Sequence, residues 1–197
     1  MFDLLALITT AGYVGLIGIV FAESGLFFGF FLPGDSLLFT AGFVASQGSL
    51  NIVVLLVSLF VAAVLGDSVG YAFGRRVGPK IFTREESRFF KPAHVVRAHD
   101  FFLKYGKKAI FLARFLPIVR TFVPIVAGVA EMPYREFVAY NILGGASWVG
   151  SMLLTGYFLG SLIPDAEKYL HVIVLIIIGV SFLPMVHEFW KARKERS

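Results

Sequence analysis

Long apolar runs, interrupted at a few points by glycine, proline or charge, dominate the pattern of this chain. A helix needs roughly 20 apolar residues to cross a bilayer. The runs predict four membrane-spanning helices, at residues 4–22, 52–73, 137–163 and 171–186. Two further segments, residues 24–48 and 109–132, are also apolar but contain both proline and charge. These two segments are not expected to form ordinary spans.

The second of these segments carries two arginines and two prolines. At the middle of a bilayer an arginine costs about 2.5–3.5 kcal/mol on an insertion scale. Pro117 and Pro124 each remove a backbone donor and interrupt a helix. Irregular backbone at this depth is stable only where it is buried in protein or lines a watered cavity. Residues 109–132 are therefore predicted to form a re-entrant hairpin whose Arg114 and Arg120 face a polar interior.

The first segment repeats this pattern with the opposite charge. Its break lies at Pro33 and Gly34, and Phe-Leu-Pro and Ala-Gly sequences recur in both segments. Glu23 and Asp35 flank the first break, where the second has arginines. Broken segments at corresponding places in two halves indicate the substrate site of a transporter. We therefore predict one all-α membrane domain, residues 1–197, with two re-entrant hairpins that enter from opposite faces.

Glycines recur along the expected spans where helices would pack closely. The first span holds three of them, Gly12, Gly15 and Gly18. The second span begins a series with a glycine at every fourth residue, Gly66, Gly70, Gly74 and Gly78. Such a series lies on one face of a helix and predicts a seam of small residues.

The distribution of charge predicts the topology. Residues 75–108 hold ten of the 18 Lys and Arg residues, so the positive-inside rule places them in the cytoplasm. Within them, residues 93–105 have the apolar spacing of an amphipathic helix at the membrane surface. The basic tail at residues 191–194 indicates a cytoplasmic C-terminus, and two opposed hairpins then place the N-terminus there too. The net charge of +5 does not indicate nucleic-acid binding, because basic and aromatic residues are not interleaved.

Composition narrows the chemistry. The chain is 57% hydrophobic and has no cysteine, which excludes disulfides and thiol catalysis. The histidines fall in loops or near span ends, at His94, His99, His171 and His187. No carboxylate or cysteine cluster has the spacing of metal ligands, so we expect neither a metal nor a cofactor. The N-terminus lacks the cationic region and cleavage site of a secretory signal, so the first apolar run is expected to remain a span.

The charges within the apolar segments define the candidate site. Arginine keeps its charge and offers a planar fork of donors that suits phosphate oxygens, so Arg114 and Arg120 are candidate anion ligands. A carboxyl group in a poorly solvated site takes up a proton more readily than in water, so Glu23, Asp35 and Asp67 are candidates for proton coupling. For Asp67 a structural role, as the partner of a buried cation, is equally open.

At these residues the chain resembles the DedA family, whose relatives include the eukaryotic VTT-domain (SNARE-associated-domain) lipid scramblases. The resemblance covers nearly the whole chain. The matching elements are Glu23, the FLPGDS motif at 31–36, the Gly-Asp and Gly-Arg pairs at 66–67 and 74–75, and the arginine–proline–arginine element at 114–120. The resemblance implies opposed re-entrant hairpins in a multi-pass protein of the bacterial cytoplasmic (inner) membrane.

The resemblance also implies lipid transport. Several family members are implicated in returning undecaprenyl phosphate to the cytoplasmic leaflet, and others in phospholipid movement. In members similar to this chain, the residues that match Glu23, Asp35, Arg114 and Arg120 are functionally required. The expected function is therefore a proton-coupled flippase for an anionic lipid, either a polyprenyl phosphate or a phospholipid. Which lipid is carried, and whether the protein is a homo-oligomer, are left open.

Three alternatives remain beside lipid transport. The acids could serve a proton-coupled exchanger of small ions or cationic drugs that supports membrane-potential homeostasis, with the arginines as structural counter-ions. A lipid phosphatase would need a nucleophile or general base near the arginines, and no histidine lies within either expected hairpin. A purely structural or regulatory membrane protein is disfavoured by buried charge at both breaks. We therefore expect a transporter and not an enzyme.

Overall fold

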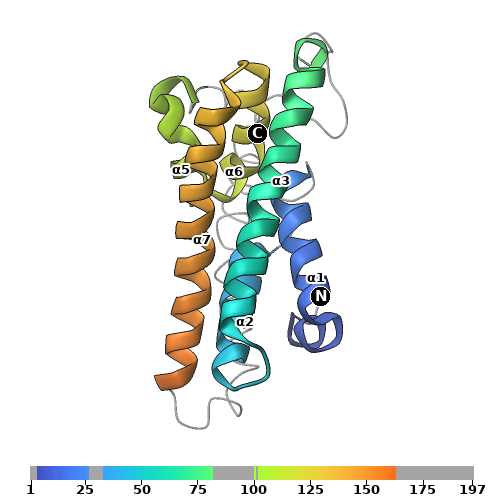
Figure 1. Ribbon diagram of the computed structural model, residues 1–197, viewed down its shortest axis with the longest axis vertical. Helices are drawn as coiled ribbons and strands as arrows, with labels where there is room; N and C mark the ends of the chain where they lie inside the picture. The colour runs from blue at the N-terminus through green and yellow to red at the C-terminus, as the bar shows by residue number, and fades with distance from the viewer. Residues whose placement is uncertain (1–3, 27–32, 82–99, 101, 163–197) are drawn as a thin grey trace, which may run out of the picture. The chain divides into compact units, whose positions relative to one another are not determined.

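The computed structural model of the protein describes residues 4–26, 33–81, 100 and 102–162 (Figure 1). All regular structure among these residues is helical. The α-helices are α1 (Leu4–Gly25), α2 (Gly34–Ser46), α3 (Ile52–Ile81), α5 (Ala109–Ala113), α6 (Pro117–Val129) and α7 (Tyr134–Leu162), and a 3₁₀ turn, η2 (Gly106–Lys108), precedes α5. The span predicted at 171–186 lies outside the described residues, and so does most of the amphipathic helix predicted at 93–105, of which residues 102–105 are helical.

The chain divides into two compact units. One unit contains Met1–Gly15, Pro33–Leu55 and Met152–Ser197, and the other contains Leu16–Leu32 and Leu56–Ser151. We call the latter the central unit. It holds α5, α6, most of α3 and the first part of α7, together with the buried charges described below.

Two of the described helices, α3 and α7, are long and apolar enough to cross a membrane, over Ile52–Val77 and Tyr134–Leu162. Both agree with spans expected from the sequence. Helix α3 nevertheless continues to Ile81, so its last residues are helical where a polar loop had been predicted to begin at residue 75. Arginine and lysine are good helix formers, so the change to polar residues at Arg75 indicates where apolar surface ends and not where the helix ends.

Helix α1 is interrupted at Gly12, which has φ 55° and ψ −151°. Glycine adopts this conformation at little cost because it has no Cβ. The sequence had suggested that Gly12 and Gly18 are packing positions, but a Cβ on either would meet nothing within 4 Å. The close approach of α1 to α3 lies further along, where Gly25 faces Gly66, and a Cβ on Gly66 would lie 2.7 Å from the Phe21 carbonyl oxygen.

In the other unit, α2 packs closely against the last part of α7. A Cβ on Gly42 would lie 2.9 Å from the carbonyl carbon of Leu153, and one on Gly156 would lie 2.9 Å from that of Phe39. Pro33 immediately precedes α2, and Gly34 is its first residue, so the break predicted at these two residues coincides with a helix start. The part of the predicted first hairpin at residues 27–32 lies outside the described residues.

The predicted second hairpin contains two short helices that pack against each other. Helix α5 ends at Ala113, with Arg114 as its C-cap residue, and Leu116 is extended. Helix α6 starts at Pro117, whose missing N–H would have no helical acceptor at this position. A break had been expected at Pro124 as well, but helix α6 continues through this residue to Val129. Pro124 costs the helix one hydrogen bond to the Arg120 carbonyl oxygen, and the burial of the residues around Pro124 offsets this loss.

The core of the central unit is built where α3, α5, α6 and the start of α7 meet. Its buried residues are Tyr71, Ala109, Ile110, Ala113, Val119, Phe122, Val123, Val126, Ala127, Met132 and Phe137. This apolar cluster fixes α6, and with it the chain that carries the two arginines, against α3.

Candidate functional site

Four charged side chains are buried together in the central unit. Glu23 comes from α1, Asp67 from α3, Arg114 from the end of α5 and Arg120 from α6. None is more than 6% exposed. Because an isolated charge at such a position would be very costly, each must be compensated by its neighbours.

Arg114 is held by partners from three helices. Its Nη2 atom lies 2.6 Å from Asp67 Oδ2, donates to Asn141 Oδ1 at 2.6 Å, and donates to the Ala63 carbonyl oxygen at 3.2 Å. Its Nη1 atom donates to Ser24 Oγ at 3.4 Å. Asn141 is itself anchored, because its Nδ2 donates to the Val64 carbonyl oxygen at 3.0 Å. The guanidinium group is therefore fixed by a charge and by neutral acceptors.

Arg120 forms the second pair. Its Nη2 atom donates to Glu23 Oε1 in a buried ion pair. The two pairs thus contain two positive and two negative charges, and their formal sum is zero. A balanced set of this kind can be buried in a membrane protein at far lower cost than either arginine alone.

Trp148 of α7 lies against both arginines. The ring centroid is 4.7 Å from Arg120 Cζ and 5.7 Å from Arg114 Cζ, and the side chain is 1% exposed. A guanidinium group over the face of an indole ring is attracted by the ring quadrupole, and Trp is the strongest aromatic partner for a cation. The Trp148 ring therefore contacts the arginine of each ion pair.

Close contacts at glycine residues bring together the helices that carry these charged side chains. A Cβ on Gly66 would lie 2.8 Å from Ser24 Cβ, so α1 and α3 touch beside Glu23 and Asp67. A Cβ on Gly144 of α7 would lie 3.0 Å from Arg114 Cγ. Any larger residue at either position would displace a helix or a side chain of the cluster. Gly66 belongs to the glycine series that the sequence had indicated.

The residues named from the sequence are distributed as follows. The structure brings Glu23, Asp67, Arg114 and Arg120 together within one unit, and it pairs Asp67 with Arg114. Asp35 lies in the first turn of α2, which belongs to the other unit, so its expected meeting with the arginines stays a prediction.

Asn141 and Trp148 were not identified from the sequence. Asn141 is fully buried in α7, and Trp148 lies two turns further along the same helix. An asparagine inside an otherwise apolar span is a signal in its own right, because polar groups at membrane depth need partners. For Trp148 the sequence offered no comparable signal, since buried aromatic residues are common.

Comparison with known proteins identifies the family. A family model for the VTT domain matches residues 32–164, which include Asp35, Asp67, both buried arginines, Asn141 and Trp148. The chain belongs to the DedA family. The DedA resemblance found in its motifs is thereby confirmed.

Curated relatives in the DedA family are similar over most of their length. An uncharacterised membrane protein of Mycobacterium leprae is 46% identical over 179 residues, 91% of this chain and 80% of the relative. An uncharacterised membrane protein of Mycobacterium tuberculosis is 48% identical over 172 residues, 86% and 75% of the two chains. Protein DedA of Escherichia coli K12 is 44% identical over 184 residues, 92% and 84%.

These names support a membrane location for this DedA-family chain. The inner membrane and the cytoplasmic location of both termini stay predictions. No solved structure matches the chain.

Proposed function

We propose that this protein transports an anionic lipid across the membrane by binding its phosphate at Arg114 and Arg120, in a step coupled to protons. The observation that carries the proposal is the pair of buried arginine–carboxylate contacts within apolar helices. Buried charge in a membrane segment is costly to maintain, and it commonly marks a substrate or proton pathway.

The two pairs suit an exchange of partners. A carboxylate that takes up a proton loses its charge and releases its arginine, whose donors can then bind a phosphate oxygen instead. One proton and one negative phosphate charge enter together, so the summed charge of the buried cluster does not change. The acid that takes up the proton would be Glu23 or Asp67, with Asp35 as a third candidate in the other unit.

Trp148 supports this exchange by its position. When a carboxylate releases its arginine, the guanidinium group still lies over the indole ring, 4.7 Å away for Arg120. Cation–π attraction does not depend on the protonation state of the acids. The arginines would therefore stay in place while their anionic partner changes from carboxylate to phosphate.

The test is leaflet-resolved transport in proteoliposomes that contain the full chain. Polyprenyl phosphate and phosphatidylethanolamine are compared as substrates, with and without a pH gradient. We expect Arg120→Ala to abolish transport of the carried lipid and Arg120→Lys, which keeps the charge but not the planar fork, to reduce it at least tenfold, the loss expected when a bidentate contact is removed. Arg135→Ala, an exposed arginine in the first turn of α7, is the matched control. Wild-type rates for folded Arg120→Lys would refute the proposal.

A proton-coupled exchanger of small ions or cationic drugs is the second candidate. It is favoured by the fact that each arginine already has a carboxylate partner, as structural counter-ions would. Flux of sodium, potassium and a cationic dye, measured in the same vesicles, separates the two functions. Cation flux without lipid transport would favour the exchanger.

A further inference from the structure

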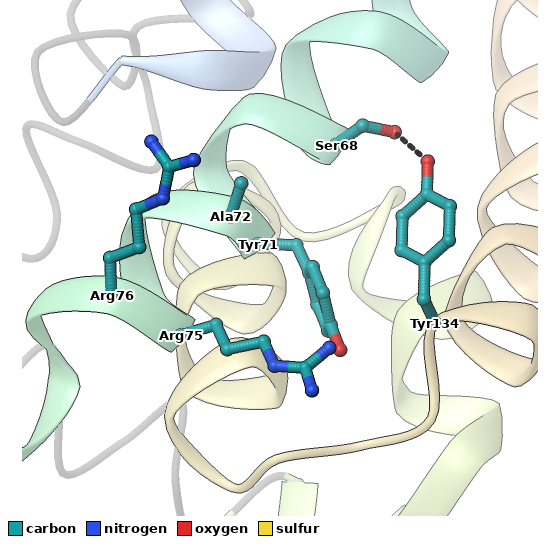
Figure 2. A pocket seen from close by; sticks show the side chains of 6 residues that line it. All are labelled: Ser68, Tyr71, Ala72, Arg75, Arg76 and Tyr134. Carbon is teal, nitrogen blue, oxygen red and sulfur yellow. Dashed lines mark hydrogen bonds between the residues drawn. The ribbon is translucent and has the colours of Figure 1, made fainter.

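A separate basic pocket lies in the central unit, toward the C-terminal end of α3. It has a volume of about 560 Å³ and is lined by Ser68, Tyr71, Ala72, Arg75 and Arg76 of α3 and by Tyr134 of α7. We call it the α3 pocket. Figure 2 shows Arg75 and Arg76 projecting from α3 in different directions, with Ser68 and Tyr134 close to each other at another edge.

The lining of the α3 pocket contains several hydrogen-bond donors and no acid. Arg75, Arg76 and Tyr134 are exposed, and the Tyr134 hydroxyl donates to Ser68 Oγ at 3.3 Å. Neither Arg75 nor Arg76 has an ion pair or a side-chain hydrogen bond within the part of the chain that the structure describes. The six lining residues include no carboxylate. Guanidinium and hydroxyl groups both donate hydrogen bonds that suit phosphate oxygens, and the lining of the α3 pocket supplies both.

The backbone beneath these side chains is fixed. Tyr71 is buried, its hydroxyl donates to the Met132 carbonyl oxygen, and its ring stacks on Phe137 with centroids 4.5 Å apart. A Cβ on Gly128 would lie 2.8 Å from the backbone nitrogen of Arg75, so α6 and α3 are in close contact at this point. The long cationic side chains of the α3 pocket therefore extend from a backbone that is held in place, as in a preformed binding site.

The position of the α3 pocket relates it to the bilayer and to the buried ion pairs. Arg75 and Arg76 are among the last residues of the candidate span Ile52–Val77, where a helix leaves the hydrocarbon region. Arg75 follows Asp67 by eight residues, which corresponds to about 12 Å along a helix. Basic pockets between transmembrane helices at the membrane surface bind lipid phosphate groups.

We propose that the α3 pocket is a second phosphate-binding site, at the membrane surface, that takes the phosphate group of an anionic lipid or of free phosphate. Its role in loading or releasing the transported lipid rests on the function proposed above. Binding itself does not, because an anionic lipid can occupy such a pocket in a protein that transports something else.

The first test is binding by the full chain in nanodiscs of phosphatidylcholine, titrated with inorganic phosphate or with short-chain phosphatidic acid. We expect the double variant Arg75→Gln/Arg76→Gln to weaken binding by at least tenfold, the loss expected when charge-assisted hydrogen bonds are removed. Arg135→Gln, which neutralises an exposed arginine next to Tyr134 but outside the lining, should stay within about twofold. Tyr134→Phe keeps the ring and removes a hydroxyl, so a smaller loss of binding is expected.

The outcomes separate the two sources of the phosphate. Binding of phosphatidic acid but not of inorganic phosphate assigns the pocket to a lipid headgroup, and binding of inorganic phosphate assigns it to any accessible phosphate. Equal loss in the Arg135→Gln control would overturn the proposal, because the effect would then reflect net charge alone. Unchanged binding by the folded double variant would overturn it directly.

The second test is the concentration dependence of lipid transport. We expect the double variant to raise the lipid concentration for half-maximal transport, with little effect on the maximal rate, whereas Arg120→Lys lowers the maximal rate. If wild-type protein transports lipid and the double variant matches it in binding and transport, the α3 pocket is refuted and the proposed function stands. If nothing is transported but the double variant loses phosphate binding, the pocket stands and the proposed function fails.

Discussion

The central unit contains two kinds of arginine, one kind buried beside Asp67 of α3 and the other exposed about 12 Å further along that helix. Arg114 and Arg120 are buried, each is paired with a carboxylate, and both lie against one indole ring. Arg75 and Arg76 are exposed and have no acid in the lining of their pocket. The same side chain therefore occupies a closed, charge-balanced environment in one region and an open, cationic one in the other.

The difference shows that the arginines must be judged by their surroundings. In the buried cluster, loss of one member leaves its partner as an uncompensated charge away from water. In the α3 pocket, water replaces a lost side chain at little cost to folding. Changes in the first region should therefore affect stability and turnover together, while changes in the second should affect affinity alone.

The largest expected effect is that of Arg114→Ala. Asp67 would be left buried without its cation, and breaking a buried pair costs about 3–5 kcal/mol. The matched change Arg75→Ala should alter the free energy of unfolding by less than about 0.5 kcal/mol. Titration with denaturing detergent measures both. Similar losses in the two variants would remove the distinction between the regions.

The next largest effect is expected for Trp148→Phe. The smaller ring is a weaker partner for both guanidinium groups, and the unfilled volume adds to the loss, so we expect about 2–3 kcal/mol. Trp148→Leu should be worse, because it removes the aromatic face. If Leu and Phe were equivalent, the contact would be one of packing only. Phosphate binding at the α3 pocket should not change in either variant.

The buried cluster and the α3 pocket also differ in how well the sequence predicts them. Buried arginine and aspartate in apolar runs are detectable because a charge there is costly wherever its partner lies. The partner itself is not detectable: Asp67 was left between a structural and a functional role, and only the packing of α3 against α5 and α6 pairs it with Arg114. Arg75 and Arg76 were assigned to a polar loop, because composition does not distinguish a loop from the polar end of a helix.

The helix ends and kinks show a related limit of prediction from the sequence. The helix start at Pro117 follows from the chemistry of proline, whereas the continuation of α6 through Pro124 depends on the neighbours that bury it. In the same way, Gly12 and Gly66 are alike in the sequence. One accommodates a kink and the other a helix contact, and only their surroundings decide which.

Glu23→Gln tests which acid carries the proton. The amide keeps the size of the side chain but removes the charge that pairs with Arg120, so about 1.5–3 kcal/mol of stability should be lost. If Glu23 is the coupling acid, transport should no longer respond to a pH gradient. Asp67→Asn is the counterpart, and it should keep the response if Asp67 is structural.

The control for these acids is Glu136→Gln. Glu136 pairs with Lys107 at 2.5 Å, but both side chains are substantially exposed, at 37% and 58%. Loss of such a pair should cost no more than about 0.5–1 kcal/mol. A response to the pH gradient that survives Glu23→Gln unchanged would exclude Glu23 from proton coupling.

The smallest change that should still separate the two regions is Gly66→Ala. One methyl group would lie 2.7 Å from the Phe21 carbonyl oxygen and 2.8 Å from Ser24 Cβ, so α1 must move away from α3. Overpacking of this kind costs about 1–3 kcal/mol. Gly18→Ala in α1 adds the same methyl group where nothing lies within 4 Å, and it should be neutral or slightly stabilising. Because Glu23 moves with α1, Gly66→Ala should lower transport while phosphate binding at the α3 pocket stays unchanged. Equal loss of both activities would mean that the two regions respond as one.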